Sequence, residues 1–287
     1  MRPVHPEVPL KKMDASLLSL ELYDTARRVV PYDDLDRVIG AATTASHLHR
    51  GQTRSVREDV PVVPYIEHPL RNTLRLMRWG STDPDLLCAS LLHDVPEDCA
   101  DRAVQVYANS VPGRDATEQT LAWIGDNFGS RVASTVRAVT NPERPAGMSD
   151  AARLAQYVEH VTHAVRGDSH ALLVKASDLT DNAGSLPHQT AGVAPEVIAK
   201  RVSKYTPVVE TVHQELLRAG RTQAIDPDLA ANAISATNGL RRTLAQMPTR
   251  AASFPSSTPH DGLNQHPLTS PASQPSRARA QRASLGR

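Results

Sequence analysis

The stretch that most constrains this chain is residues 86–98, in which an apolar run leads directly into polar residues. Residues 86–92 are apolar on nearly every face of a helix, which predicts a helix buried in the middle of the fold. Asp83 and Pro84 precede it as a suitable N-cap and first helical residue. The run ends in polar groups that are able to bind a metal ion or move protons: His93, Asp94, Glu97 and Asp98.

These polar groups form two adjacent pairs separated by Val95 and a proline. Residues four apart share a helix face, so a continuous helix would place Glu97 one turn beyond His93. Asp98 would lie one turn beyond Asp94, in a second column. Pro96 would clash with the carbonyl of the preceding turn in a regular helix, so we expect a kink that re-aims the acidic pair. A helix end that is merely polar is the simpler interpretation of His93 and Asp94 alone, unless further ligands occur elsewhere.

Two further candidate ligands lie on other predicted helices. His68 stands before Pro69, which suits the first position of a helix, so we expect His68 at the N-cap. Residues 171–182 begin too apolar to form a surface helix, yet four polar residues there and just beyond fall on one face: Lys175, Asp178, Asn182 and Ser185. The combined set mixes imidazole and carboxylate groups, as in the coordination shell of a catalytic divalent ion: His68, His93, Asp94 and Asp178.

Such a site has a clear chemical use. Two nitrogens and two hard oxygens suit manganese, iron, zinc or magnesium, and ligand type alone does not choose among them. A bound metal lowers the pKa of water and stabilises charge on a phosphoryl oxygen, as hydrolysis of a phosphate ester or anhydride requires. Glu97 and Asp98, titrating as a coupled pair, would orient or deprotonate that water. The alternatives are that His68 is only a cap and that Asp178 is a core carboxylate paired with Lys175.

Composition excludes several classes of protein. The 287 residues are 40% hydrophobic, and 32 basic residues nearly balance 31 acidic ones, so no global field draws the chain to nucleic acid or an anionic membrane. No stretch approaches the roughly 20 apolar residues of a membrane span. The start lacks the apolar core of a secretory signal, and Cys88 and Cys99 indicate no disulfide framework. We therefore expect a soluble, cytoplasmic protein.

Helical periodicity predicts the domain organisation. No alternating pattern is long enough for a sheet, so the chain is expected to be all-α, a helical bundle with a metal site in its core. Residues 1–13 contain three prolines and are expected to form a flexible arm. The helical domain should cover 14–222, and a further helix should cover 223–247. Residues 248–287 contain six prolines, many serines and one acid, which predicts a disordered tail.

Six short motifs follow one another over roughly residues 40–186, about half of the chain. They are H-x-G-Q-x-R, P-Y-I-x-H-P-L, L-L-H-D-x-x-E-D, F-G-x-x-V, V-T and V-K-x-x-D-x-x-x-N. In this order they resemble the hydrolase half of the RelA/SpoT-type alarmone enzymes, within the HD phosphohydrolase superfamily. Because no synthetase domain follows residue 220, the resemblance is closest to the single-domain small alarmone hydrolases.

The resemblance implies a fold, an activity and a site. The family is all-α, binds manganese and removes the 3′-pyrophosphate from guanosine tetra- and pentaphosphate, (p)ppGpp. A partner enzyme that makes the alarmone, or a toxin, is then expected in the cell. Carried over by motif, the metal ligands would be His68, His93, Asp94 and Asp178, and Glu97 with Asp98 would act on the attacking water. The nucleotide would be held by Arg54, which matches the arginine on the base, and by Lys175, Asn182 and Ser185.

Departures from the family pattern keep other functions open. The segment at residues 55–63 is longer than in the family, and Ser55 stands where a lysine usually follows the arginine. Leu179 and Thr180 stand where the family usually has arginine and leucine, and Gly184 stands where a basic residue is common, which removes positive charge from the substrate side. The alternatives are hydrolysis of another nucleotide, such as NADPH or a phosphorylated adenosine, and a non-catalytic, antitoxin-like binding module. The intact ligand set argues against the second alternative.

Overall fold

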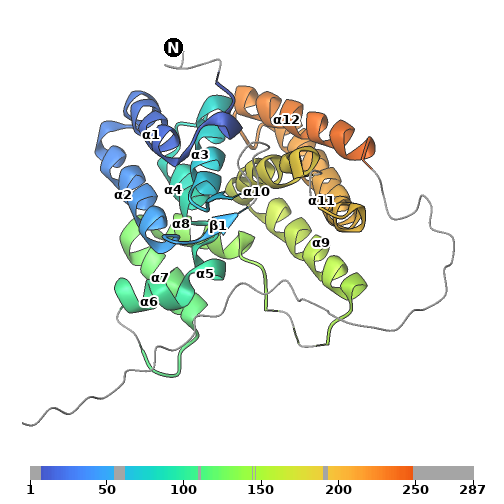
Figure 1. Cartoon of the computed structure of the whole chain (residues 1–287). Coiled ribbons are helices and arrows are strands. Elements are labelled where there is room, and N and C mark those ends of the chain that lie inside the picture. Colours follow the sequence, from blue (N-terminus) through green and yellow to red (C-terminus); the bar gives the residue numbers. More distant parts are fainter. Residues whose placement is uncertain are drawn as a thin grey trace, which may run out of the picture. The chain divides into compact units, whose positions relative to one another are not determined.

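The structure is a computed structural model that describes residues 8–54, 62–108, 111–143, 145, 147–189 and 193–247. In these residues helices dominate, which confirms the predicted all-α class (Figure 1). The α-helices are α1 (Ala15–Val29), α2 (Tyr32–Leu48), α3 (Glu67–Trp79), α4 (Pro84–Leu92), α5 (Val95–Asp98), α6 (Ala100–Val106), α7 (Ala116–Phe128), α8 (Ser130–Val139), α9 (Asp150–Gly167), α10 (Ser169–Asn182), α11 (Pro195–Arg221) and α12 (Pro227–Ala245). Two 3₁₀ helices, η1 (Leu10–Lys12) and η2 (Ala183–Gln189), and two short strands, β1 (Thr53–Arg54) and β2 (Val63–Pro64), complete the described elements.

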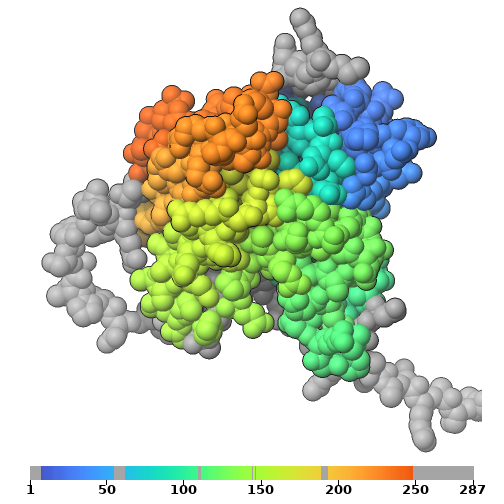
Figure 2. Space-filling model, turned by 180° about the vertical axis from the view of Figure 1, so that it is seen from behind, coloured from blue at the N-terminus to red at the C-terminus, as the bar shows by residue number. Residues whose placement is uncertain are grey.

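Three helices, α3, α4 and α10, contact one another at the centre of the bundle. Around them, α1 packs on α3, α2 and α8 pack on α4, and α9, α11 and α12 pack on α10 (Figure 1). On the opposite face, the green-to-orange second half of the chain covers most of the surface (Figure 2). The central trio therefore brings together segments that lie more than a hundred residues apart in the sequence.

Helix α4 is buried because neighbours surround it. Every residue from Leu86 to Leu92 is buried, as its apolar sequence predicts, and α2, α3, α8 and α10 all pack against it. The Asp83 side chain caps the helix by accepting hydrogen bonds from the backbone nitrogens of Asp85 and Leu86. Pro84 occupies the first turn, where its missing N–H costs nothing.

The chain is interrupted at the polar motif that follows α4. Helix α4 ends at Leu92, and a separate single turn, α5, begins at Val95 with Pro96 in its first turn. Proline has no N–H to continue the hydrogen-bond ladder, so a new helix starts there. The expectation of two side-chain columns on one continuous helix is therefore wrong, whereas the expected interruption at Pro96 is present.

The ends of the chain differ in part from expectation. Residues 1–7 and the predicted tail at 248–287 lie outside the described residues. Residues 8–13 do not form a loose arm, because Leu10 and Met13 are buried in the core and η1 packs on α3. In the predicted C-terminal segment, α12 packs along α11. None of the helices described has the length and apolar character needed to cross a lipid bilayer.

The long segment after Arg54 is bracketed by a small antiparallel ladder that the sequence did not predict. Thr53 pairs with Pro64 and Arg54 with Val63. This pairing brings Arg54 back beside the start of α3, although residues 55–61 themselves lie outside the described part of the chain.

A buried ionic network joins α3 to α10. The Arg71 guanidinium, fully buried, donates to Glu67 Oε2 at 2.9 Å and to Asp181 Oδ1 and Oδ2 at 2.8 and 3.1 Å. Arg75 Nη2 also donates to Asp181 Oδ1, at 3.2 Å. Burial alone would raise the pKa of Asp181, but Arg71, His68 and Arg75 outweigh it and hold that pKa well below its usual range. Asp181 is therefore an ionised carboxylate in the core.

Replacing Arg71 tests this network. Arg71→Met should lower the free energy of unfolding by about 3–5 kcal/mol, because it leaves Glu67 and Asp181 buried without their main cation. Arg137→Met is the control, since its partner Glu118 is exposed and such pairs contribute only about 0–1 kcal/mol. Urea denaturation measures both, and equal losses in the two variants would contradict the network's role.

The cap of α4 gives a prediction in pH. A hydrogen bond from His170 lowers the pKa of Asp83 from 3.8 to about 2 in the folded protein. The carboxylate therefore adds stability above pH 3.8, and this contribution is lost as pH falls toward 2. Asp83→Asn keeps a capping oxygen but loses the charge. The stability gap between the two proteins should shrink as pH falls from 5 toward 2, as measured by urea denaturation; a gap that widens over this range would contradict the assignment.

Candidate metal centre

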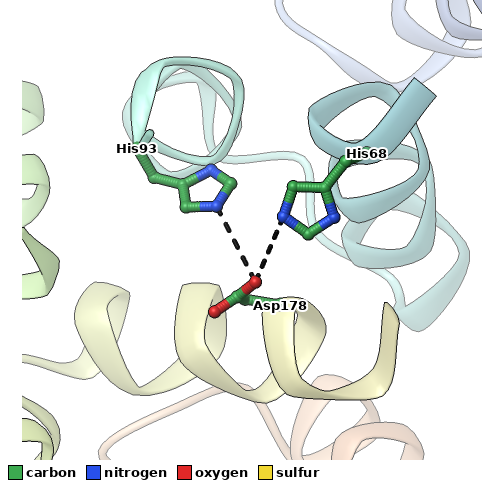
Figure 3. Close-up of side chains that lie close together, drawn as sticks. All are labelled: His68, His93 and Asp178. Atoms are coloured by element: carbon green, nitrogen blue, oxygen red, sulfur yellow. Dashed lines mark ion pairs between the residues drawn. The ribbon is translucent and has the colours of Figure 1, made fainter. Parts of the chain in front are cut away.

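The candidate ligands come from each of the three central helices. Helix α3 supplies His68, the end of α4 supplies His93, and α10 supplies Asp178 (Figure 3). All three are buried, and one ligand atom from each lies within 4.8 Å of the others. Figure 3 shows both imidazole rings directed at the Asp178 carboxylate across the space between the helices. His68 lies in the first turn of α3 and not at its N-cap, because the helix starts at Glu67.

Asp94, the fourth predicted ligand, joins the same cluster. Its Oδ1 lies 3.2 Å from His93 Nε2, and its Oδ2 lies 3.4 Å from His68 Nε2. Asp178 Oδ1 lies 3.2 Å from His68 Nε2 and 3.9 Å from His93 Nε2. The structure thus brings all four predicted ligands together around one point.

The two imidazoles are oriented by partners on their far sides. His68 Nδ1 lies 2.8 Å from Asp181 Oδ2, and His93 Nδ1 lies 2.8 Å from the Ser90 carbonyl oxygen. Both partners only accept hydrogen bonds, so each Nδ1 donates and each Nε2 faces the cluster. His93 Nε2 is buried with no hydrogen-bond partner among the described residues. This pattern is the one that metal-binding histidines show, and the donor set fits a divalent cation.

The carboxylates of the cluster are ionised. Burial opposes ionisation of Asp94, but His93 and His68 outweigh it and lower the pKa. For Asp178, Lys175 and then His68 overcome burial and hold the pKa well below its usual range. Lys175 Nζ donates to Asp178 Oδ2 at 3.1 Å, so Oδ1 remains directed at the histidines. Lys175 therefore has the structural role of ion-pair partner that the sequence left open.

Glu97 and Asp98 are separated by the structure. Glu97 lines a small cavity beside the candidate ligands, whereas Asp98 does not. Although both residues are exposed by surface area, desolvation of the carboxyl group and then the charge of Asp94 raise both pKa values. A carboxyl group with a raised pKa exchanges protons closer to neutral pH, as a general acid or base requires.

A cavity of about 110 Å³ opens onto the cluster. Of the predicted substrate-binding residues, Arg54, Lys175 and Asn182 line it, and Arg54 donates to the Asn182 side-chain oxygen. Ser185 does not line the cavity. It is buried and bonded to Lys11 Nζ and to the Asp181 carbonyl oxygen, each at 2.5 Å.

Several residues at this site were not predicted from the sequence. The Tyr65 hydroxyl donates to Asp94 Oδ2 at 2.7 Å, and Tyr65 lies inside a recognised motif. Lys204 Nζ lies 4.9 Å from the ring centre of Tyr157 and 5.2 Å from that of Tyr205, and all three line the cavity. Their helices, α9 and α11, carry no recognised motif, so no local signal marked them. Asp181 lies three residues after Asp178, a spacing that would have placed it near the same face.

No protein-family model matches the chain. The guanosine-3′,5′-bis(diphosphate) 3′-pyrophosphohydrolase MESH1 of Danio rerio is 32% identical over 164 residues, which are 56% of this chain and 73% of that protein. MESH1 of Mus musculus is 32% identical over 144 residues, 50% of this chain and 65% of that protein.

A longer bacterial protein with the same enzyme name, from Vibrio cholerae, is 28% identical over 165 residues. That match covers 58% of this chain but only 20% of the bacterial protein, so the chain spans about a fifth of the length of such relatives. The match to MESH1 of Danio rerio, in contrast, extends over most of that protein. The chain therefore belongs to the family of the guanosine-3′,5′-bis(diphosphate) 3′-pyrophosphohydrolases.

Proposed function

We propose that this protein is a metal-dependent hydrolase that removes the 3′-pyrophosphate from (p)ppGpp, with Mn²⁺ as its ion. The observation that carries this proposal is the convergence of His68, His93 and Asp178 within 4.8 Å, beside a cavity that His68 and Asp178 line. Family membership supports the same reaction, because the relatives are named for it. An alarmone-making partner enzyme and a cytoplasmic location remain predictions from the sequence.

The ion would be held by His68, His93, Asp94 and Asp178. When bound, a divalent cation lowers the pKa of water and neutralises charge on a phosphoryl oxygen. Mixed imidazole and carboxylate donors suit Mn²⁺, which accepts both oxygen and nitrogen ligands. The Tyr65 hydroxyl orients Asp94 by its hydrogen bond to Oδ2.

Protein side chains would supply the proton transfer and the phosphate binding. Glu97 lines the cavity with a raised pKa, which suits a base that takes a proton from the attacking water. Positive charge stands on the cavity wall at Arg54, Lys175 and Lys204, where it would attract a pyrophosphate group. Asn182, which links Arg54 to Asp178, would contact the nucleotide.

Activity on a panel of nucleotides tests the substrate. With Mn²⁺, the protein should release pyrophosphate from ppGpp faster than it hydrolyses NADPH or ATP assayed side by side. Asp94→Ala should abolish release because the cluster loses a ligand, whereas Asp150→Ala, which removes an exposed carboxylate on α9, should not. Preference for another nucleotide would contradict the substrate, and no hydrolysis with manganese, zinc, iron or magnesium would contradict the enzymatic function.

Metal binding can be tested without activity. Tyr65→Phe removes the hydroxyl that orients Asp94 and should weaken Mn²⁺ binding about 10-fold, because outer partners of ligands contribute that much. Isothermal titration of protein stripped with a chelator measures the affinity. Tyr107→Phe is a matched control, since it removes a hydroxyl bonded to His47, which is not among the cavity-lining residues. Equal Mn²⁺ affinities in the two variants would contradict the assignment.

A further inference from the structure

The Glu97 carboxylate is held from one side by a single residue. The Asn141 backbone nitrogen donates to Oε1 at 2.7 Å, and Asn141 Nδ2 donates to Oε1 at 3.1 Å and Oε2 at 2.9 Å. These are all the hydrogen bonds that the carboxylate accepts from the described residues. Bonds from N–H groups to a carboxylate are charge-assisted, and contact with both oxygens fixes its plane as well as its position.

Glu97 and Asn141 together separate two spaces. Both line the 110 Å³ cavity that contains His68, Asp94 and Asp178. Both also line a neighbouring groove of about 790 Å³, between α5, α7 and the end of α8, which contains no candidate metal ligand. A glutamate side chain at this boundary therefore has room to turn either way.

The backbone at Glu97 does not restrict this choice. Helix α5 is a single turn, held by bonds from Thr117 Oγ1 to the Pro96 carbonyl at 3.3 Å and from Gln52 Nε2 to the Asp98 carbonyl at 3.1 Å. Those bonds fix the main chain but leave the torsions of the Glu97 side chain free. Among the described residues, the hydrogen bonds that select the orientation of the carboxylate all come from Asn141.

Asn141 itself is firmly placed. It follows α8 by two residues, and α8 packs against both α4 and α10, the helices that carry three of the candidate ligands. The position of Asn141 is thus tied to the same central helices as the metal cluster. A donor fixed in this way holds the carboxylate at a constant distance from the ligands.

We propose that Asn141 is a positioning residue that holds the Glu97 carboxylate on the metal side of the boundary, where it accepts the proton of the attacking water. This inference rests on the proposed hydrolase function and assigns a role that none of the sequence motifs marks. Oε1 accepts two of the three bonds from Asn141 and Oε2 accepts only one, so Oε2 keeps a lone pair on which the proton can still be accepted.

Truncating the amide tests the role. Asn141→Ala keeps the backbone donor but loses Nδ2, so kcat for ppGpp should fall about 10- to 100-fold. KM and the Kd for Mn²⁺ should stay unchanged, because the substitution alters neither the cationic residues of the cavity wall nor the candidate metal ligands. Asn141→Asp preserves the shape of the side chain but places a second carboxylate beside Glu97. Its kcat should therefore fall at least as far as that of Asn141→Ala. Asn127→Ala, which removes an amide bonded to the Trp123 carbonyl on α7, should keep full activity.

A double-mutant cycle separates positioning from a general structural effect. If Asn141 acts through Glu97, then Asn141→Ala should cause no further loss of kcat in a Glu97→Gln background. Losses that multiply would overturn the proposal, as would an unchanged kcat in both Asn141 variants of an active enzyme. A wild-type protein that binds Mn²⁺ but hydrolyses no nucleotide would overturn the hydrolase function and this role together.

Discussion

The ionised, fully buried carboxylate of Asp181 is the constraint on which the arrangement of the central helices depends. It binds Arg71 and Arg75 of α3 and at the same time accepts the hydrogen bond from His68 Nδ1. A buried charge is costly unless it is paired, so these contacts fix the register of α10 against α3. The same contacts orient His68, so the packing of the core and the geometry of the candidate metal centre have a common cause.

The interruption between α4 and α5 divides the polar motif into separate tasks. Residues up to Asp94 remain attached to the buried end of α4 and face α3 and α10. Pro96 lies in the first turn of a new helix, α5, whose side chains have different neighbours from those of α4. Glu97 therefore accepts hydrogen bonds from Asn141, while Asp98 lies outside the cavity. A continuous helix would have stacked two acids directly over the ligands and raised the cost of ionising them together.

The candidate ligands could be picked out from the sequence because they lie in short motifs with strong local meaning. His93 and Asp94 end an apolar helix, and Asp178 lies on the polar face of another, so each stood out without knowledge of the fold. The remaining parts of the site depend on contacts between distant elements. Tyr157 and Lys204 resemble ordinary residues of amphipathic helices, and Ser185, on the expected face, turns out to bond Lys11 from a segment predicted to be flexible.

By itself, the sequence determined the helical class, the central position of α4 and the four residues able to bind a metal, because periodicity and residue type are local properties. Only the tertiary structure decided which nitrogen of each histidine faces the cluster, since that choice is made by Asp181 and the Ser90 carbonyl. The tertiary structure also decided the directions of the Glu97 and Asp98 side chains. A side chain's direction at a helix break depends on the partner it meets, and for Glu97 that partner is 44 residues away in the sequence.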